Sequence, residues 1–568
     1  MEEIKVPGKS NTDIEKTATK YAVKNAYEHE GRAEVGAVVG KVKALFPDVI
    51  IGQVMPIITK VVSEVNGLKK EELKERYELF NEAGWELKQV EKEKVLPELT
   101  WLKKGEKIMT RVAPNPSGAM HFGHARPAIL SDEYVRKYGG KLFVRFDDTD
   151  PKIKKPVEGI EKEFLEEFKW LGIKVEGIYN ASNNLKRYYK IIEQLIADGN
   201  AYVCSCQGEE WREKVWKGEA CECREKNAKE QMKQWKDMLK WKLKEGSCVV
   251  RIKTDLNDKD SSVRDWWLAK IVDNVEHPNK KVLKNHVWPA YNFASAIDDH
   301  DMGINFIIRG QEHIQNEKKQ RYLYDYFKWV YPHTMYHGKV AQVGDMVLSK
   351  SKIKVLMEKE GLSRDDDPRL ATLKSFRRRG FRPEAIRKVI FSLGLNPNEA
   401  RVGIENFAAA NKEIIGEVNS YPFIEDGCEI EVMGFVNGKT NAYGSEEIFG
   451  GVIQKIIIDK KNLKELQQGD LVRMKDGFNI KIEEVNEYGG RAKFLGYEKT
   501  SEKYKMMDWL KEGIDVKVLM SDGKERLGMS GKGLLKEKAG NEVNLLGLGF
   551  VNIERIEEKG IYCIFSYE

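Results

Sequence analysis

The sequence has few cysteines and prolines, no long hydrophobic run and no large excess of one charge. Its 568 residues include 7 cysteines and 16 prolines. So few cysteines exclude the dense disulfide framework of small secreted domains, and so few prolines exclude collagen-like and mucin-like chains. The longest apolar run, at residues 49–58, contains a glycine, a glutamine and a proline. It falls short of the roughly 20 residues that span a bilayer, so we expect no membrane segment.

The charges are numerous but balanced. There are 96 basic and 90 acidic side chains, a net charge of +6, so a polyanion must be bound by local basic patches. Hydrophobic residues make up 41% of the chain, a value typical of folded proteins. Residues 1–9 contain two glutamates and no apolar core, unlike a secretory signal. We therefore expect a cytoplasmic location.

The length predicts about four domains, and the hydrophobic pattern changes along the chain. Residues 1–98 have helical spacing at 11–31, 36–46 and 71–94. From residue 108, short apolar runs at 108–112, 141–146 and 304–308 alternate with helical stretches, which predicts a parallel sheet covered by helices. Residues 202–289 interrupt this alternation, the run 370–393 is helical, and Asp-Gly and Asn-Gly turns after residue 421 predict β-barrels. The expected domains are 1–98, 99–199, 200–288, 289–345, 346–415 and 416–568, where 289–345 completes the sheet begun in 99–199.

Two segments carry candidate catalytic groups. Residues 111–124 read Arg-Val-Ala-Pro-Asn-Pro-Ser-Gly-Ala-Met-His-Phe-Gly-His, and they precede a helical stretch. A helix N-terminus offers free N–H groups to an anion, and His121 and His124 could stabilise charge on an α-phosphate during in-line attack. Residues 347–352, Val-Leu-Ser-Lys-Ser-Lys, follow Gly344-Asp345 and predict a mobile loop whose Lys350 could contact a pyrophosphate leaving group. Each segment alone is also compatible with a structural role.

Together and in this order, the two segments resemble the signature sequences of class I aminoacyl-tRNA synthetases. Arg-Phe-Asp-Asp-Thr-Asp-Pro at 145–151 is similar to the glutamyl and glutaminyl subgroup, as are the strings at 291–294, 297–300, 308–313 and 366–380. The resemblance covers residues 108 to about 400. The β-rich end, including residues 543–554, is similar to the archaeal and eukaryotic branch of the glutamyl-tRNA synthetase family.

The resemblance implies a multidomain α/β plus β protein. Its expected parts are an N-terminal helical unit, a Rossmann-like catalytic domain with an inserted acceptor-stem domain, a helical connector that contacts the tRNA stem, and C-terminal β-barrels that bind the anticodon. It implies activation of glutamate by ATP with Mg²⁺, typically after tRNA has bound. The glutamyl group would then pass to the terminal adenosine of tRNA(Glu), and of tRNA(Gln) in some archaeal relatives. We expect a monomer.

The resemblance also assigns roles to residues. His121, His124 and Lys350 would stabilise the α-phosphate, and Ala113 and Gly123 would complete the ATP site. Arg111, Asp147, Tyr291 and Arg309 would bind glutamate. Arg309 is the discriminating position, because a guanidinium favours a γ-carboxylate over a neutral amide. The alternative is that Arg309 only pairs with an internal carboxylate.

Two further groups are candidates outside the catalytic motifs. Cys204-Ser-Cys206 and Cys221-Glu-Cys223 form two close thiol pairs that could close a structural zinc site, although unliganded reduced cysteines remain an alternative. Arg377, Arg378 and Arg379 lie where the family contacts the inner bend of tRNA, although a charge run is often only a solvated face. For the whole chain, the rival hypotheses are a glutaminyl enzyme, a non-enzymatic tRNA-binding relative and a small nucleotidyltransferase.

Overall fold

The computed structural model describes residues 11–29, 31–46, 49, 51–82, 96–361, 365–498, 504–558 and 560–568. The chain divides into two compact units, Met1–Lys94 and Val95–Glu568. The division lies close to the domain boundary expected at residue 98. Within the described residues, no helix combines the length and the apolar character that crossing a membrane requires.

The first unit is a bundle of four helices, α1 (Asn11–Glu28), α2 (Val35–Leu45), α3 (Ile51–Asn66) and α4 (Lys70–Glu82). Small and β-branched side chains such as Ala22, Val38 and Ile58 fill its core. Helix α3, which the sequence reading did not identify, contains Pro56. It forms because Val54, Ile58, Val61 and Val65 recur at helical spacing and bury one face. The expected helix at 71–94 is described only as far as Glu82.

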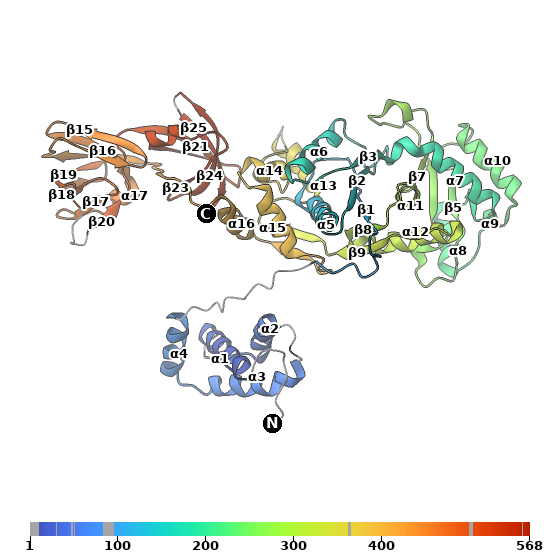
Figure 1. Cartoon of the computed structure of the whole chain (residues 1–568), viewed down its shortest axis with the longest axis horizontal. Coiled ribbons are helices and arrows are strands. Elements are labelled where there is room, and N and C mark those ends of the chain that lie inside the picture. Colours follow the sequence, from blue (N-terminus) through green and yellow to red (C-terminus); the bar gives the residue numbers. More distant parts are fainter. Residues whose placement is uncertain are drawn as a thin grey trace. The chain divides into compact units, whose positions relative to one another are not determined.

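The second unit begins with a five-stranded sheet in the order β3-β2-β1-β8-β9 (Figure 1). All four strand pairings are parallel, which confirms the predicted parallel sheet. Its strands and the helices that connect or cover them are β1 (Ile108–Val112), α5 (Phe122–Tyr138), β2 (Gly140–Phe146), α6 (Ile160–Trp170), β3 (Gly177–Asn180), α7 (Leu185–Ala197), α11 (Tyr291–Asp301), β8 (Phe306–Gly310), α12 (Ile314–Phe327) and β9 (His333–His337).

Glycine is required where β2 starts. Gly140 has a φ of 136°, and a Cβ atom there would lie 1.9 Å from the carbonyl oxygen of Ile108. Any side chain at this position would therefore separate β1 from β2. Since parallel strands present their carboxyl ends at one edge, residues that follow β1, β2 and β8 lie close together in space.

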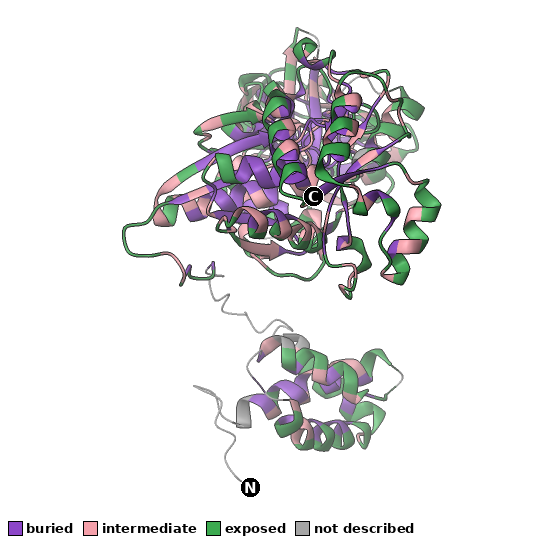
Figure 2. Ribbon diagram, turned by 90° about the vertical axis from the view of Figure 1, so that its right-hand side faces the viewer, coloured by how far each residue is buried: buried purple, intermediate pink, exposed green. Residues whose placement is uncertain are grey.

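Residues between α7 and α11 form an inserted unit whose core is continuous with buried residues of α7, α11 and α12. Its antiparallel sheet has the order β4-β5-β6-β7. Trp288 of this sheet and Trp235 of α10 are among the buried side chains of that core. Figure 2 shows that buried residues gather along the strands and the inward faces of helices. The elements are β4 (Ala201–Cys204), α8 (Gly208–Lys217), α9 (Glu222–Glu225), α10 (Ala228–Leu239), β5 (Val249–Ile252), β6 (Trp267–Ile271) and β7 (Val287–Pro289).

A helical connector follows the parallel sheet. The helix expected at residues 370–393 is two helices, because Gly380 has a φ of 88° and Pro383 starts a new helix. Strands β10 and β11 pair in parallel across the connector. The elements are β10 (Val340–Val343), α13 (Lys350–Glu360), α14 (Leu373–Arg378), α15 (Pro383–Leu393), β11 (Ala400–Val402) and α16 (Ile404–Ile415).

The remaining residues form two six-stranded sheets, β12-β23-β24-β25-β21-β22 and β16-β13-β19-β18-β17-β20. In each sheet an antiparallel bridge joins the two edges, between Ile424 and Met529 in one and between Ile457 and Leu510 in the other. The C-terminal part is therefore rich in sheet, as predicted. Its strands are β12 (Ser420–Pro422), β13 (Gly427–Met433), β16 (Ile453–Asp459), β17 (Leu471–Met474), β18 (Asn479–Asn486), β19 (Gly489–Gly496), β20 (Lys505–Met507), β21 (Gly513–Leu519), β22 (Glu525–Gly531), β23 (Glu542–Leu546), β24 (Gly549–Glu557) and β25 (Gly560–Tyr567); a hairpin of β14 (Gly438–Ala442) and β15 (Ser445–Phe449) and the helix α17 (Lys460–Leu463) accompany them.

The end of β25 is fixed to the connector by Arg379, which is only 2% exposed. Its Nε donates to the carbonyl oxygen of Phe565 at 3.1 Å, and its Nη2 donates to the carbonyl oxygen of Ser566. The hydroxyl of Ser566 in turn donates to the carbonyl oxygen of Arg379. One buried guanidinium thus joins the connector to the last strand of the chain.

We expect Arg379→Met to destabilise this junction by about 2–4 kcal/mol, because two buried carbonyl groups lose their donor. Calorimetric melting of the full chain, together with hydrogen exchange along β25, measures the loss. The matched control is Arg377→Met, which removes the same charge from an exposed side chain and should leave both readouts unchanged. Equal effects of the two substitutions would contradict the assignment.

Candidate active site

All the predicted catalytic and substrate-binding residues except Lys350 line one cavity of about 1100 Å³ at the carboxyl ends of the parallel strands. Side chains from β1, α5, β8 and α11, and from the loops that follow β1 and β2, line it. The inserted unit contributes Trp267, Lys270 and Trp288 to the same cavity. Among the lining residues are the predicted Arg111, Ala113, His121, Gly123, His124, Asp147, Tyr291 and Arg309.

His121 and His124 begin helix α5 and cap its N-terminus. The Gly123 N–H donates to Nδ1 of His121 at 3.1 Å, and the His121 N–H donates to Nδ1 of His124 at 3.2 Å. The two rings lie 3.7 Å apart, centre to centre. Because Nδ1 of each ring accepts a backbone proton, Nε2 carries the proton in the neutral ring and can donate to a ligand. A Cβ atom at Gly123 would lie 3.0 Å from the His121 ring, so glycine permits this arrangement.

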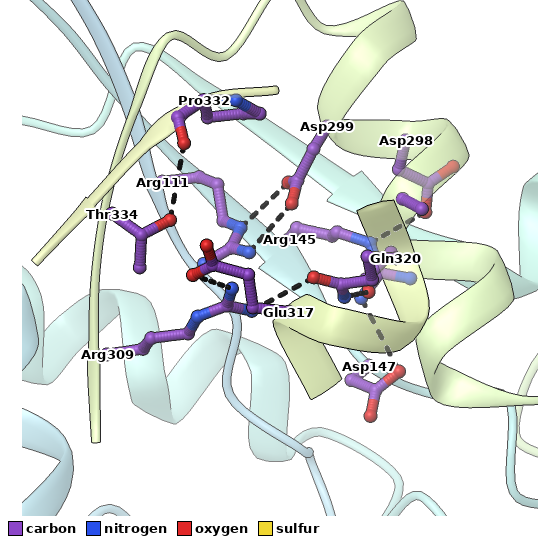
Figure 3. Close-up of polar contacts among 12 residues, drawn as sticks. Arg111, Arg145, Asp147, Asp298, Asp299, Arg309, Glu317, Gln320, Pro332 and Thr334 are labelled. Carbon is purple, nitrogen blue, oxygen red and sulfur yellow. Dashed lines mark hydrogen bonds and ion pairs between the residues drawn. The ribbon is translucent and has the colours of Figure 1, made fainter. Parts of the chain in front are cut away.

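Asp147 follows β2 and lies beside a buried ion pair. Nε of Arg145 donates to Asp298 at 2.6 Å, and Nη1 of Arg145 lies 3.4 Å from Asp147 (Figure 3). Burial raises the pKa of Asp147, an effect that Arg145 only partly offsets. A positively charged group of a ligand in the cavity would therefore stabilise the Asp147 carboxylate.

Arg111 forms a bidentate ion pair with Asp299 of α11. Its Nε and Nη2 each donate to one carboxylate oxygen at 2.8 Å. Burial opposes the charge of Arg111, but Asp299 outweighs it and raises the pKa of the guanidinium. The sequence reading quoted Asp298 and Asp299 within a family-like string but gave them no role. Their signal was two acids among the apolar residues of a buried helix.

Arg309 lines the cavity and also has partners within the protein (Figure 3). Its Nη1 donates to Gln320 at 3.0 Å, and its Nη2 donates to Tyr331 at 2.7 Å and lies 3.4 Å from Glu317. Its Nε is buried without a partner among the described residues. Arg309 thus pairs with an internal carboxylate and also lines the cavity, so its role in binding glutamate stays a prediction.

The second motif begins a helix. Val347 N–H donates to the carbonyl oxygen of Arg369 at 2.8 Å, and Lys350 is the first residue of α13. The prediction of a loop at Lys350 is therefore wrong, because the chain turns into a helix there. Leu348, Ser349 and Lys352 line the cavity, whereas the side chain of Lys350 lies outside the described part of the structure.

The histidines that end two of the family-like strings, His313 and His300, have different surroundings. His313 lines the cavity 5.9 Å from the Tyr291 ring, and burial lowers its pKa, which favours the neutral ring. His300 instead stacks on Trp329 at 3.7 Å and does not line the cavity. His313 therefore joins the candidate site, and His300 has a structural contact.

The four predicted metal ligands converge in the inserted unit. The sulfur atoms of Cys204, Cys206, Cys221 and Cys223 all lie within 4.8 Å of one another, with the closest pairs at 3.8 and 4.0 Å. Zinc–sulfur bonds of about 2.3 Å in a tetrahedron require sulfur separations of about 3.8 Å. The donor set and its spacing therefore fit a four-thiolate zinc site. Nothing else among the described residues forms such a group.

The three arginines predicted to contact tRNA have different environments. Arg377 is exposed, and Arg378 is held by Glu554 at 2.7 Å and Asp366 at 3.3 Å. Arg379 is buried at the junction with β25. The expected RNA contact is therefore wrong for Arg379, whose guanidinium is used within the protein.

Comparison with known proteins places this fold and site in one class. The family model for the catalytic domain of class I tRNA synthetases (E and Q) matches residues 107–416. A glutamate–tRNA ligase from Pyrococcus abyssi is 42% identical over 98% of this chain and 100% of its own length. One from Methanocaldococcus jannaschii is 35% identical over the same shares. A solved glutamate tRNA ligase from Elizabethkingia meningosepticum is 19% identical, with a TM-score of 0.40 over 55% of this chain and 70% of that chain.

The parallel sheet, the paired histidines at a helix start and the family match define a class I tRNA synthetase catalytic domain. Glutamate–tRNA ligases are 35% and 42% identical to this chain over 98% of its length. The chain therefore belongs to the glutamate–tRNA ligase family, as the signature sequences predicted.

We expect the purified protein to contain about one zinc ion per chain, measured by atomic emission. Cys221→Ser removes one of four ligands and should lower the zinc content severalfold, because three thiolates hold zinc far less tightly than four. The control, Cys248→Ser, changes a buried thiol outside the cluster and should keep the metal. Zinc retained in Cys221→Ser, or absent from the unaltered protein, would argue against the site.

Proposed function

We propose that the chain activates glutamate with ATP and transfers the glutamyl group to the 3′-terminal adenosine of tRNA(Glu). The observation that carries this proposal is that one cavity is lined both by His121 and His124 and by Arg309 and Asp147. The two histidines suit a phosphate group, and Arg309 with Asp147 suits an amino acid that has an acidic side chain.

The amino acid would lie between the carboxylate and the two arginines. Asp147, whose pKa is raised by burial, gains a counter-charge from the α-ammonium of the substrate. Tyr291 would form one wall. The γ-carboxylate would reach Arg309 and Arg111, and the unpaired Nε of Arg309 offers it a donor that a neutral amide uses less well. The glutamine-specific alternative therefore has less support.

ATP would lie at the start of α5, with Ala113 and Gly123 close to the nucleotide. The α-carboxylate of glutamate attacks the α-phosphorus, the bond to the bridging oxygen breaks, and pyrophosphate leaves. The Nε2–H groups of His121 and His124 would stabilise the negative charge on the α-phosphate oxygens, and Lys350 would contact the departing pyrophosphate. Mg²⁺, bound with ATP, would neutralise phosphate charge.

The other parts of the chain would position tRNA. We assign residues 200–288 to the acceptor stem, residues 346–415 to the inner bend of the tRNA and the sheets of 416–568 to the anticodon; 99–199 and 289–345 build the catalytic domain. Arg377 and Arg378 are the arginines left to contact the phosphate backbone.

The four-cysteine zinc site would be structural, because all four ligand positions are filled by protein. We further propose a monomer, with tRNA(Gln) as a second candidate acceptor.

Pyrophosphate exchange tests this function directly. The protein is incubated with ATP, labelled pyrophosphate and either glutamate or glutamine, each with and without tRNA. We expect exchange with glutamate, dependent on tRNA, and little with glutamine. Exchange with glutamine alone would show that Arg309 has been misread, and no exchange under any condition would favour a tRNA-binding role.

His121→Asn should lower kcat of this exchange by about 10²–10³-fold, since one donor to the α-phosphate is lost. Asparagine is a good N-cap residue, so the helix start is retained and the loss reports on chemistry. His300→Asn, a histidine substitution outside the cavity, should leave kcat unchanged. An unchanged kcat in His121→Asn would remove this histidine from the mechanism.

A further inference from the structure

Behind Arg309 lies a carboxylate that does not itself reach the cavity. Glu317 is on helix α12, one turn after the start of that helix, and is absent from the residues that line the cavity. Arg309, in front of it, is 5% exposed and does line the cavity. Glu317 therefore makes no contact with a substrate in the cavity, and its ion pair with Arg309 links it to the site. The argument that follows rests on the proposed recognition of glutamate.

Glu317 is held more tightly by other partners than by Arg309. Its Oε1 accepts hydrogen bonds from Nε and Nη2 of Arg321 at 2.9 and 2.6 Å, and its Oε2 accepts one from the hydroxyl of Tyr336. The distance to Arg309 is longer, 3.4 Å. Burial raises the pKa of Glu317, but the hydrogen bonds from Tyr336 and Arg321 outweigh burial and lower it. Glu317 is therefore an anion at neutral pH.

The protein thus balances the charge of Arg111 and part of the charge of Arg309, because Glu317 is shared between Arg309 and Arg321. Arg111 faces Asp299 in a bidentate pair, and Arg309 faces Glu317 (Figure 3). A glutamate side chain would bring a further negative charge to this end, whereas glutamine would bring none. An anion several ångströms away disfavours a second anion and has little effect on a neutral amide.

We propose that Glu317 tunes the amino-acid specificity of this site by offsetting the charge that Arg309 presents to the substrate side chain. It is a positioning residue that acts through Arg309. The chain consequently separates glutamate from glutamine less strongly than it would with a neutral residue at position 317.

The test measures exchange kinetics in the full chain with glutamate and with glutamine, in the presence of tRNA. Glu317→Gln keeps the shape and the contacts to Tyr336 but removes the charge. We expect KM for glutamate to fall about three- to tenfold, with kcat unchanged, and the ratio of kcat/KM for glutamate over glutamine to rise by the same factor.

A second variant should change KM for glutamate in the opposite direction. Arg321→Gln removes the main counter-charge of Glu317, so the anion acts more fully on Arg309. KM for glutamate should rise and the ratio should fall. The control is Lys318→Gln, which also removes one positive charge, next to Glu317 in sequence. Lys318 pairs with Asp260 of the inserted unit, so this substitution should change neither KM for glutamate nor the specificity ratio.

A purely structural role for Glu317 predicts a different result. If Glu317 only held Arg309 in place, both Glu317→Gln and Arg321→Gln would raise KM for glutamate. That outcome, or an unchanged ratio in Glu317→Gln, would overturn the inference while leaving the proposed function intact. If the unaltered protein activated neither amino acid, the proposed function and this inference would both fail.

Discussion

Three arginines buried beside four carboxylates hold the active site together. Arg111, Arg145 and Arg309 come from three adjacent strands of the parallel sheet, and their partners include Asp298 and Asp299 of α11. Removing one partner from such a buried set leaves an uncompensated charge, which costs about 3–5 kcal/mol. The network therefore requires the strand ends and the helices to keep their relative positions.

This network also explains how the catalytic sheet tolerates a large insertion. Arg111 and Asp299 are separated by 188 residues in sequence, yet they form a buried bidentate ion pair beside the cavity. The insertion leaves after α7 and returns at α11, and both helices contact Arg145 or its partner Asp298. The inserted unit can thus add Trp267 and Lys270 to the cavity wall without separating the two halves of the sheet.

The sequence indicated which residues line the cavity better than it indicated which charged groups form ion pairs there. Histidines, arginines and the Asp147 carboxylate were recognisable because their residue types and order match one reaction. The ion-pair partners of these arginines were not recognisable. Asp299 is 188 residues from Arg111 in sequence, and Glu317 lies in a helix with an ordinary pattern of charges. Arg379 shows the same limit, since a run of three arginines carries no sign that one of them is buried. Helix α3 was missed because its apolar run contains a proline.

Backbone contacts, rather than side chains, bring the two signature motifs together. Residues 369–373 run between them: Phe122 N–H donates to the carbonyl oxygen of Ala371, and Leu373 N–H donates to that of Met120. On the other side, Val347 exchanges backbone hydrogen bonds with Arg369 and Ala371. These bonds involve the backbone alone, but the side chains of residues 370–373 are fully buried, so core packing limits the substitutions that keep the motifs aligned. A further steric limit lies at Gly523, in the turn between β21 and β22, where a Cβ atom would lie 2.7 Å from Nε of Arg369.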